Sequence, residues 1–369
     1  MDLSQSHTPS RMIWVDVMKL FLILEVVLIH SNISVLLQES SLESSGLFAL
    51  DFVKYLSQGL TSVAVPLFFI LSGFLFFKGV RTFTWQIYVT KMRRRVVTML
   101  VPYLIWCMFG GVLFLAKVFW LGYDGYDIIV NGHVNWLKWL AGFWSLLGAS
   151  MPVPFAFAFW FLRNLIAFVI LSPLANFVGR NIYAFVIFIV LYIFKSDIIH
   201  LETFGFEWFV SGVALTMLNY DSWISKRISY RVIVGTGIIW SICAYIPMLI
   251  SYEPLINIIE ILKVLSAGIF IWQISLRFVN LARRSTWFRN LVKATFWIYA
   301  VHQFFCLLIG RFWIATIGPR AFMGVMMCYM MDFVTLLSIS LLSWVVMRRF
   351  SPRLVDVLTG GRASASAPR

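Results

Sequence analysis

Four ionisable side chains interrupt the apolar stretch 11–32: Asp16, Lys19, Glu25 and His30. Such groups are costly at bilayer depth, so they mark either a functional site or a satisfied interior pair. Around a helix, Lys19 lies about 60° and His30 about 40° from Asp16, whereas Glu25 points roughly the opposite way. One helix face therefore carries polar groups from end to end. A structural Asp16–Lys19 ion pair with a hydrogen-bonded core histidine is the alternative.

His30 is the residue of this stretch best suited to catalysis. A neutral imidazole can remove a proton from a hydroxyl because its unperturbed pKa lies near neutrality. Asp16 lies about 21 Å away along the helix, so a partner that orients His30 must come from another helix. Tyr299 and His302 lie three residues apart on one helix face. His302 is the second candidate base, and a structural bond to a tyrosine or a carbonyl is its other explanation.

A basic cluster, KMRRR at residues 91–95, precedes another apolar stretch. Arginine binds phosphate through a planar, two-pronged guanidinium, so Arg94 and Arg95 are candidates for a phosphate site. Asp16 and Lys19 begin the first apolar helix on the same predicted side, where they would line the same mouth. The alternative is that the cluster only anchors the cytoplasmic side of the membrane.

Other polar groups within apolar stretches have simpler explanations. Arg163 follows two aromatic residues into a predicted span and requires a counter-charge or a cage of carbonyls. Glu260 and Lys263 are spaced for an ion pair. Ser72 would be a nucleophile only beside a base, and helix packing explains it better. No GxxxxGK[ST], HExxH or GxSxG motif occurs, so nothing indicates an ATP motor, a zincin or an α/β-hydrolase.

The composition indicates a membrane protein. Of 369 residues, 61% are hydrophobic and 12% are charged, which is too little polar surface to cover a soluble core. The net charge of +14 does not indicate nucleic acid, because lysines and arginines cluster between apolar stretches as the positive-inside rule predicts. The four cysteines lie in apolar stretches without a disulfide or metal pattern, so no metal and no bound cofactor is expected.

Long apolar helices must position these residues. We predict an all-α integral membrane protein, a bundle of about ten transmembrane helices with both termini cytoplasmic. The expected spans are 13–37, 60–78, 97–119, 156–177, 182–194, 205–219, 232–250, 255–276, 290–310 and 322–347. Residues 38–57 are expected to form a loop and 120–154 an interfacial or re-entrant segment. Pro102 predicts a kink at the start of the third span.

Three regions follow from this pattern: a cytoplasmic N-terminal segment (1–12), a ten-helix membrane domain (13–347) and a basic cytoplasmic tail (348–369). The end of the tail is expected to be disordered because it is rich in alanine, serine and proline. No internal repeat is strong enough to predict two related halves.

Six segments, in order along the chain, resemble the membrane-bound acyltransferase 3 family, the bacterial integral-membrane enzymes that O-acylate sugars, polysaccharides and some small molecules. They are RMIWVDVMKLFLILEVVLIHS, VPLFFILSGFLFFKG, KMRRRVVTMLVPYLIW, FWFLRNLIAFVILSPL, ATFWIYAVHQF and SPRLVDVLTGGR. The first segment carries Arg11, Asp16, Lys19 and His30 at the family's spacing. The resemblance implies a stand-alone ten-span form in the bacterial inner membrane.

The resemblance also implies the reaction. An acyl group, in most members acetyl, would pass from cytoplasmic acyl-CoA to a hydroxyl of a sugar or of a cell-surface or exported polysaccharide. His30 would be the general base, and the acyl-CoA co-substrate would bind Arg94, Arg95 and Lys19. The supporting residues would be Asp16, Arg11, Arg163, Tyr299 and His302. The family's Arg-x-x-Arg pattern is incomplete, because Thr98 stands three residues after Arg95.

Two other classes of protein stay open on the sequence alone. A transporter or flippase for a glycan or small molecule would also carry ionisable groups in its spans, although related halves with broken helices are not visible. A membrane receptor or assembly factor would use His30 and the arginines only for folding. The expected partners are acyl-CoA, a carbohydrate acceptor and membrane lipids, without nucleic acid.

Overall fold

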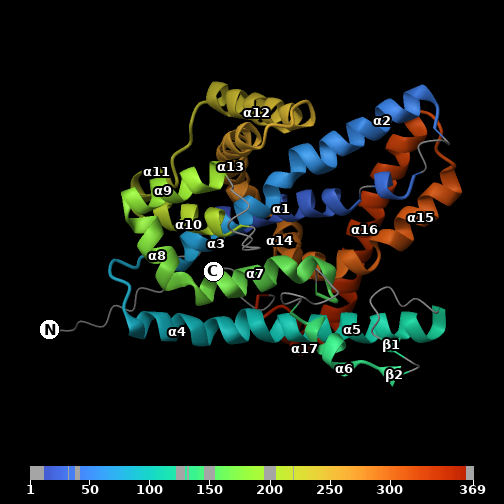
Figure 1. Cartoon of the computed structure of the whole chain (residues 1–369), viewed down its shortest axis with the longest axis horizontal. Helices are drawn as coiled ribbons and strands as arrows, with labels where there is room; N and C mark the ends of the chain where they lie inside the picture. Colours follow the sequence, from blue (N-terminus) through green and yellow to red (C-terminus); the bar gives the residue numbers. More distant parts are fainter. Residues whose placement is uncertain are drawn as a thin grey trace.

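A computed structural model describes residues 12–31, 33–37, 42–121, 129–130, 133–144, 154–194, 205–218 and 220–362. Within these ranges the fold is a bundle of α-helices with one small strand pair (Figure 1). The strands β1 (Ile129–Val130) and β2 (His133–Val134) pair antiparallel beside α5, and each has two residues. The predicted all-α class is confirmed.

The α-helices divide between the two halves of the chain. In the first half they are α1 (Ile13–His30), α2 (Ser44–Lys54), α3 (Ala64–Phe77), α4 (Trp85–Arg95), α5 (Val101–Leu121), α6 (Trp136–Ala141), α7 (Trp160–Ile170), α8 (Ser172–Arg180) and α9 (Ile182–Ile193). In the second half they are α10 (Phe206–Leu215), α11 (Tyr220–Trp223), α12 (Tyr230–Tyr245), α13 (Glu253–Arg284), α14 (Thr286–Val301), α15 (Cys306–Ile317), α16 (Phe322–Phe350) and α17 (Pro352–Leu358).

Short turns of 3-10 helix occur at Ile33–Val35, Thr61–Val63, Phe157–Phe159, Ile246–Met248 and His302–Phe304. Turns of π-helix occur at Tyr55–Leu60 and Val96–Leu100. These turns change the direction or the phase of the longer helices that they join.

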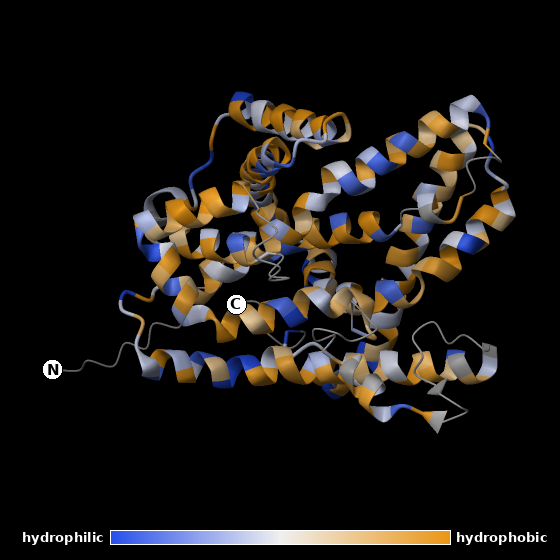
Figure 2. Cartoon of the chain, in the orientation of Figure 1, coloured by the Kyte–Doolittle hydropathy of each residue, from blue (hydrophilic) through white to orange (hydrophobic). Residues whose placement is uncertain are grey.

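Five helices of the described chain are long and apolar enough to cross a membrane, or up to seven if each of two bent pairs counts as one span. The prediction of ten spans with cytoplasmic termini is therefore not confirmed. The helices α9 and α10 have 12 and 10 residues, fewer than the roughly 20 that a perpendicular span requires. Apolar side chains of α12, among them Val234, Ile238 and Ile242, are exposed, as expected for lipid contact. Figure 2 shows that much of the α12 ribbon is hydrophobic by residue type.

Two expected boundaries are wrong. Residues 38–57 do not form only a loop, because a helical segment runs from Ser44 to Phe77. Its N-terminal part packs against α16 through Ala49 and Val53, which cluster with Val325, Cys328 and Tyr329. The third span begins earlier than 97, at Trp85, because a π-turn before Pro102 lets the helix continue into α5.

Two other expected spans are broken by bends. The helices α7 and α8 meet at 74°, since Pro173 stands in the first turn of α8. The helices α14 and α15 meet at 63°, where the turn His302–Phe304 separates them. The second break contains no proline, so it has no comparable signal in the sequence.

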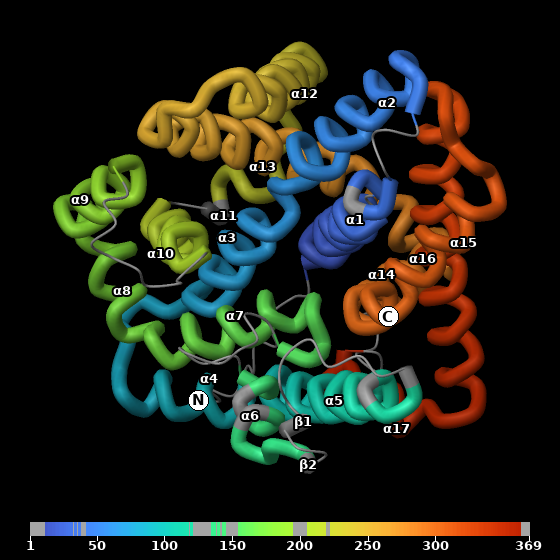
Figure 3. The backbone as a smooth tube through the Cα atoms, turned by 45° about the vertical axis from the view of Figure 1, so that its right-hand side comes forward, coloured from blue at the N-terminus to red at the C-terminus, as the bar shows by residue number. Residues whose placement is uncertain are grey.

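The first helix is the centre of the bundle. In Figure 3 α1 lies inside a ring of helices, and its neighbours include α3, α13 and α14. Nine of its residues are buried, although the helix also carries its four ionisable groups. Beside it, α3 crosses α10 so closely that a Cβ on Gly73 would collide with the Phe209 carbonyl. A Cβ on Gly212 would likewise collide with the Ile70 carbonyl.

This crossing gives the first prediction. Gly73→Ala forces α3 and α10 apart, and overpacking of this kind costs about 1–3 kcal/mol. The unfolding temperature of the detergent-solubilised protein should fall by several degrees. Gly235→Ala in α12 is the matched control, because a Cβ there has nothing within 4 Å. Equal unfolding temperatures for the two variants would show that the crossing does not stabilise the fold.

Candidate active site

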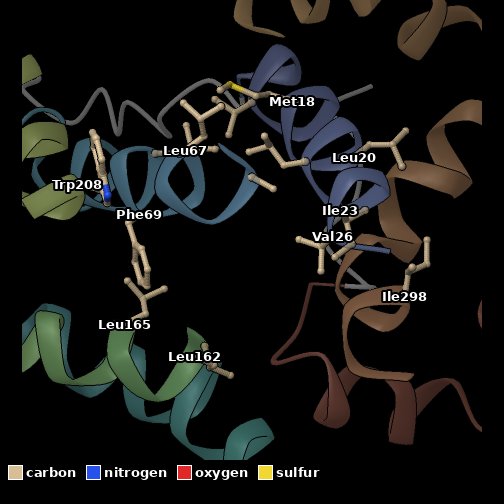
Figure 4. Close-up of a cluster of buried hydrophobic side chains, with 14 of the residues drawn as sticks. Met18, Leu20, Ile23, Val26, Leu67, Phe69, Leu162, Leu165, Trp208 and Ile298 are labelled. Carbon is tan, nitrogen blue, oxygen red and sulfur yellow. The ribbon is translucent and has the colours of Figure 1, made fainter. Parts of the chain in front are cut away.

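A cavity of about 620 Å³ lies beside α1 and joins its two polar ends. Most of its wall is apolar and comes from α1, α3, α7 and α14. Figure 4 shows part of this wall: Ile23 and Val26 on α1 face the helix that carries Leu162 and Leu165. The polar groups of the lining gather at two places, which we call the basic end and the histidine end.

The basic end consists of Asp16, Lys19, Arg95, Lys293 and Arg362, all of which line the cavity. Asp16 and Lys19 form the predicted ion pair, with 3.9 Å between Oδ1 and Nζ. The end thus has four cationic side chains and one carboxylate. Such an excess of positive charge in an apolar bundle favours an anionic ligand.

Only one of the two predicted arginines reaches the cavity. Arg95 lines it, and its guanidinium lies 5.8 Å from the centre of the Phe76 ring. Lys91 holds the same region by donating to the Phe76 carbonyl over 2.5 Å. Arg94 is exposed and absent from the lining, so its assignment to the donor site is not supported. Neighbouring helix positions point about 100° apart, which explains the difference between the two.

Arg362 is the site residue that sequence reasoning missed. The end of the tail, which was expected to be disordered, lies outside the described residues; the described part forms α17 and continues in a turn to Arg362. The Arg362 guanidinium lies 4.5 Å from the centre of the Phe296 ring. The sequence offered two signals: the family-like segment SPRLVDVLTGGR ends in this arginine, and the pair Gly360–Gly361 permits a sharp reversal of the chain just before it.

The histidine end contains His30 at the last residue of α1. Its ring packs edge-on against Phe157, with 5.7 Å between ring centres, and lies 5.1 Å from the ring of His302. His302 is fully buried and absent from the lining of the cavity. Its Nδ1 lies 2.9 Å from the Ile298 carbonyl, so Nδ1 carries the proton and donates. The bond to a carbonyl that was the other explanation for His302 is therefore present.

Tyr299 positions the backbone beside His30 rather than bonding to His302. Its hydroxyl donates to the Ala158 carbonyl over 2.7 Å. The Gln303 side-chain oxygen accepts from the Ala158 amide, so both polar groups of this peptide position are held. Phe157 and Ala158 line the cavity in a 3-10 turn. Side chains from the far end of the sequence thus fix the non-helical segment that faces His30.

The remaining candidates are structural or lie elsewhere. Arg163 donates to the Trp144 carbonyl over 3.3 Å and to Asn164 Oδ1 over 3.1 Å, and it does not line the cavity. Lys263 pairs with Glu260, as predicted, and donates to Ser62. Arg11 lies outside the described residues.

Possible nucleophiles and possible metal ligands both bear on the chemistry of the site. Ser72 lines the cavity, but no serine, threonine or cysteine hydrogen-bonds to His30 within the described chain. The described residues also contain no cluster of three or more metal-ligating side chains. The cysteines Cys107, Cys243, Cys306 and Cys328 are free thiols outside the lining.

The fold and the cavity define a multi-pass membrane protein with an internal site that joins a cationic end to a histidine. Comparison with protein families indicates the class of reaction. A family model for an acyltransferase domain, acyltransferase 3, matches residues 12–348, nearly the whole chain. The chain belongs to this family, as its motifs indicated, and is a membrane acyltransferase. A search of curated proteins and a search of solved structures found no match.

The hydrogen bond from the Tyr299 hydroxyl to the Ala158 carbonyl gives the second prediction. Tyr299→Phe leaves the buried Ala158 carbonyl without its donor, which costs about 1–3 kcal/mol. We expect the unfolding temperature to fall by several degrees. Tyr88→Phe is the matched control, because the Tyr88 hydroxyl also donates to a backbone carbonyl, that of Ile170, in an exposed position. A fall in unfolding temperature of the same size in both variants would refute a special role for the hydrogen bond between Tyr299 and Ala158.

Proposed function

We propose that the protein transfers an acyl group, acetyl in the first instance, from acyl-CoA to a hydroxyl of a sugar or a cell-surface or exported polysaccharide. One observation carries this proposal: a single cavity links the cationic end to His30. An acyl-CoA has the same two-ended chemistry, with phosphates at one end and a thioester at the other. Membership of the acyltransferase 3 family supplies the class of reaction.

The basic end suits the phosphates of the donor. Arg95 offers a planar guanidinium that can bind phosphate through two parallel hydrogen bonds. Lys19 and Lys293 add compact positive charges on α1 and α14. The acyl-pantetheine arm would then lie along the apolar wall toward His30, about 16 Å from Lys19 along α1. In this proposal the basic end faces the cytoplasm, where acyl-CoA is found.

In this proposal the base is His30 and not the neighbouring His302. A base must lie within hydrogen-bond reach of the hydroxyl, and His30 lines the cavity whereas His302 does not. The proton on Nδ1 of His302 is held by the Ile298 carbonyl, which leaves Nε2 as an acceptor. Within the described residues this buried Nε2 has no hydrogen-bond partner.

The reaction would run by direct attack. His30 takes the proton of the acceptor hydroxyl, whose oxygen forms the new ester bond at the thioester carbonyl. The carbon–sulfur bond breaks, and the CoA thiolate leaves and receives a proton. The absence of a described nucleophile bonded to His30 favours this path over an acyl-enzyme. We place the enzyme in the bacterial inner membrane, with membrane lipids around the bundle and the acceptor at the histidine end.

The third prediction separates the two ends of the cavity. His30→Ala should reduce acetyl transfer by at least about 100-fold, as expected for loss of a general base, while donor binding persists. Arg95→Gln should instead weaken donor binding. Transfer is measured as CoA thiol released by protein in lipid nanodiscs, together with base-labile acetate on extracted surface glycans. Binding is measured as the CoA-dependent rise in unfolding temperature.

Arg93→Gln is the matched control for Arg95→Gln, because Arg93 is exposed on the same helix and does not line the cavity. It should leave both measurements unchanged. Normal acetylation by folded His30→Ala protein, or a trapped covalent acyl-enzyme, would contradict the mechanism. Wild-type protein that neither binds CoA nor consumes acetyl-CoA would contradict the proposed function and favour a transporter or flippase.

A further inference from the structure

We propose that Arg362 binds the phosphates of the donor together with Arg95. In this proposal the fold of segment 352–362 places the Arg362 guanidinium at the donor site. This inference rests on the proposed function, since it names a further residue of the same donor site. Arg362 lies beyond residues 12–348, the part that the family model matches. The assignment therefore comes from the geometry of this chain.

The segment is docked against the bundle on both sides. The helix α17 packs against α5 and α16, and its Val355 is buried. The Trp106 indole on α5 donates to the Leu358 carbonyl over 3.1 Å. Thr359 is buried and its hydroxyl donates back to the Val355 carbonyl over 2.8 Å. The last turn before the glycines is thus fixed by helices that also belong to the core.

Two consecutive glycines then turn the chain toward the cavity. Gly360 and Gly361 have φ values of 62° and 75°, a left-handed conformation that other residues rarely adopt. The Gly361 amide donates to the Asp356 carbonyl over 2.7 Å. A Cβ on Gly360 would collide with the carbonyl of Thr98, in the π-turn that follows Arg95. Contact with this turn therefore places Arg362 on the same side of the cavity as Arg95.

The Arg362 side chain is held in place but its charge is not balanced. One guanidinium nitrogen donates to the Thr359 carbonyl over 2.7 Å, and the group stacks over Phe296. Burial, and next the neighbouring Arg95 guanidinium, lower the pKa of Arg362 to about 10, so it remains charged at neutral pH. No carboxylate in the described chain pairs with either arginine. Two half-buried cations that repel each other are the arrangement that a phosphate anion would stabilise.

Arg362→Gln tests the proposal directly, and it is the fourth prediction. Loss of one charge-assisted phosphate contact is worth about 1.5–3 kcal/mol, so CoA affinity should fall by about 10- to 100-fold. Affinity for pantetheine, which has no phosphate, should not change. Arg353→Gln is the control, because Arg353 is an exposed arginine of α17. Both affinities are measured by titration calorimetry on the full chain in detergent.

Two more variants keep the test decisive. Arg362→Lys retains the charge but not the planar fork; it should bind CoA several-fold more weakly than wild type even if Arg362→Gln does not fold. Gly360→Val keeps the arginine but disrupts its turn, and it should lose CoA affinity while pantetheine binding persists. If Arg362→Gln or Arg362→Lys binds CoA as tightly as wild type while Arg95→Gln binds CoA more weakly, this inference is overturned and the proposed function stays intact. Failure of wild-type protein to bind CoA would instead refute the proposed function.

Discussion

The cost of placing charge inside an apolar helical bundle governs this structure. Two of its embedded cations are satisfied within the protein. Lys263 has Glu260 and Ser62, and Arg163 has a carbonyl and an amide oxygen. The basic end of the cavity is different, because Arg95 and Arg362 rest on aromatic rings and repel each other. An imbalance kept at such cost indicates a ligand that supplies the missing negative charge.

At the histidine end, backbone polar groups must also be satisfied inside an apolar bundle. Non-helical backbone at membrane depth leaves peptide groups without partners unless protein atoms satisfy them. At the turn beside His30, the Ala158 amide and carbonyl are satisfied by Gln303 and Tyr299. At the break after α14, the Ile298 carbonyl accepts from His302. One short stretch of sequence, 298–303, thus satisfies backbone groups at both places and forms part of the surroundings of His30.

The sequence was informative where a charge interrupts an apolar stretch, because that cost is local. Lys19 and His30, singled out in this way, both line the cavity, as does Arg95 from the basic cluster. Helix α9 was likewise predicted almost to the residue from its apolar run between Asn181 and Phe194. By contrast, the choice between Arg94 and Arg95 depends on which way a helix face turns, which only packing decides. The meeting of His30 with His302 joins opposite ends of the chain, and no local pattern encodes it.

The separation of the two ends has its own physical reason. A general base becomes positive when it takes a proton, so a nearby cation opposes its action. At an effective dielectric constant near 20, two unit charges repel by about 4 kcal/mol at 4 Å but by about 1 kcal/mol at 16 Å. In the proposed reaction, the apolar wall between the ends would allow a strongly cationic donor site and an effective base to share one cavity. An apolar wall also disfavours water, so a thioester bound along it would meet an acceptor hydroxyl more readily than a hydrolytic water.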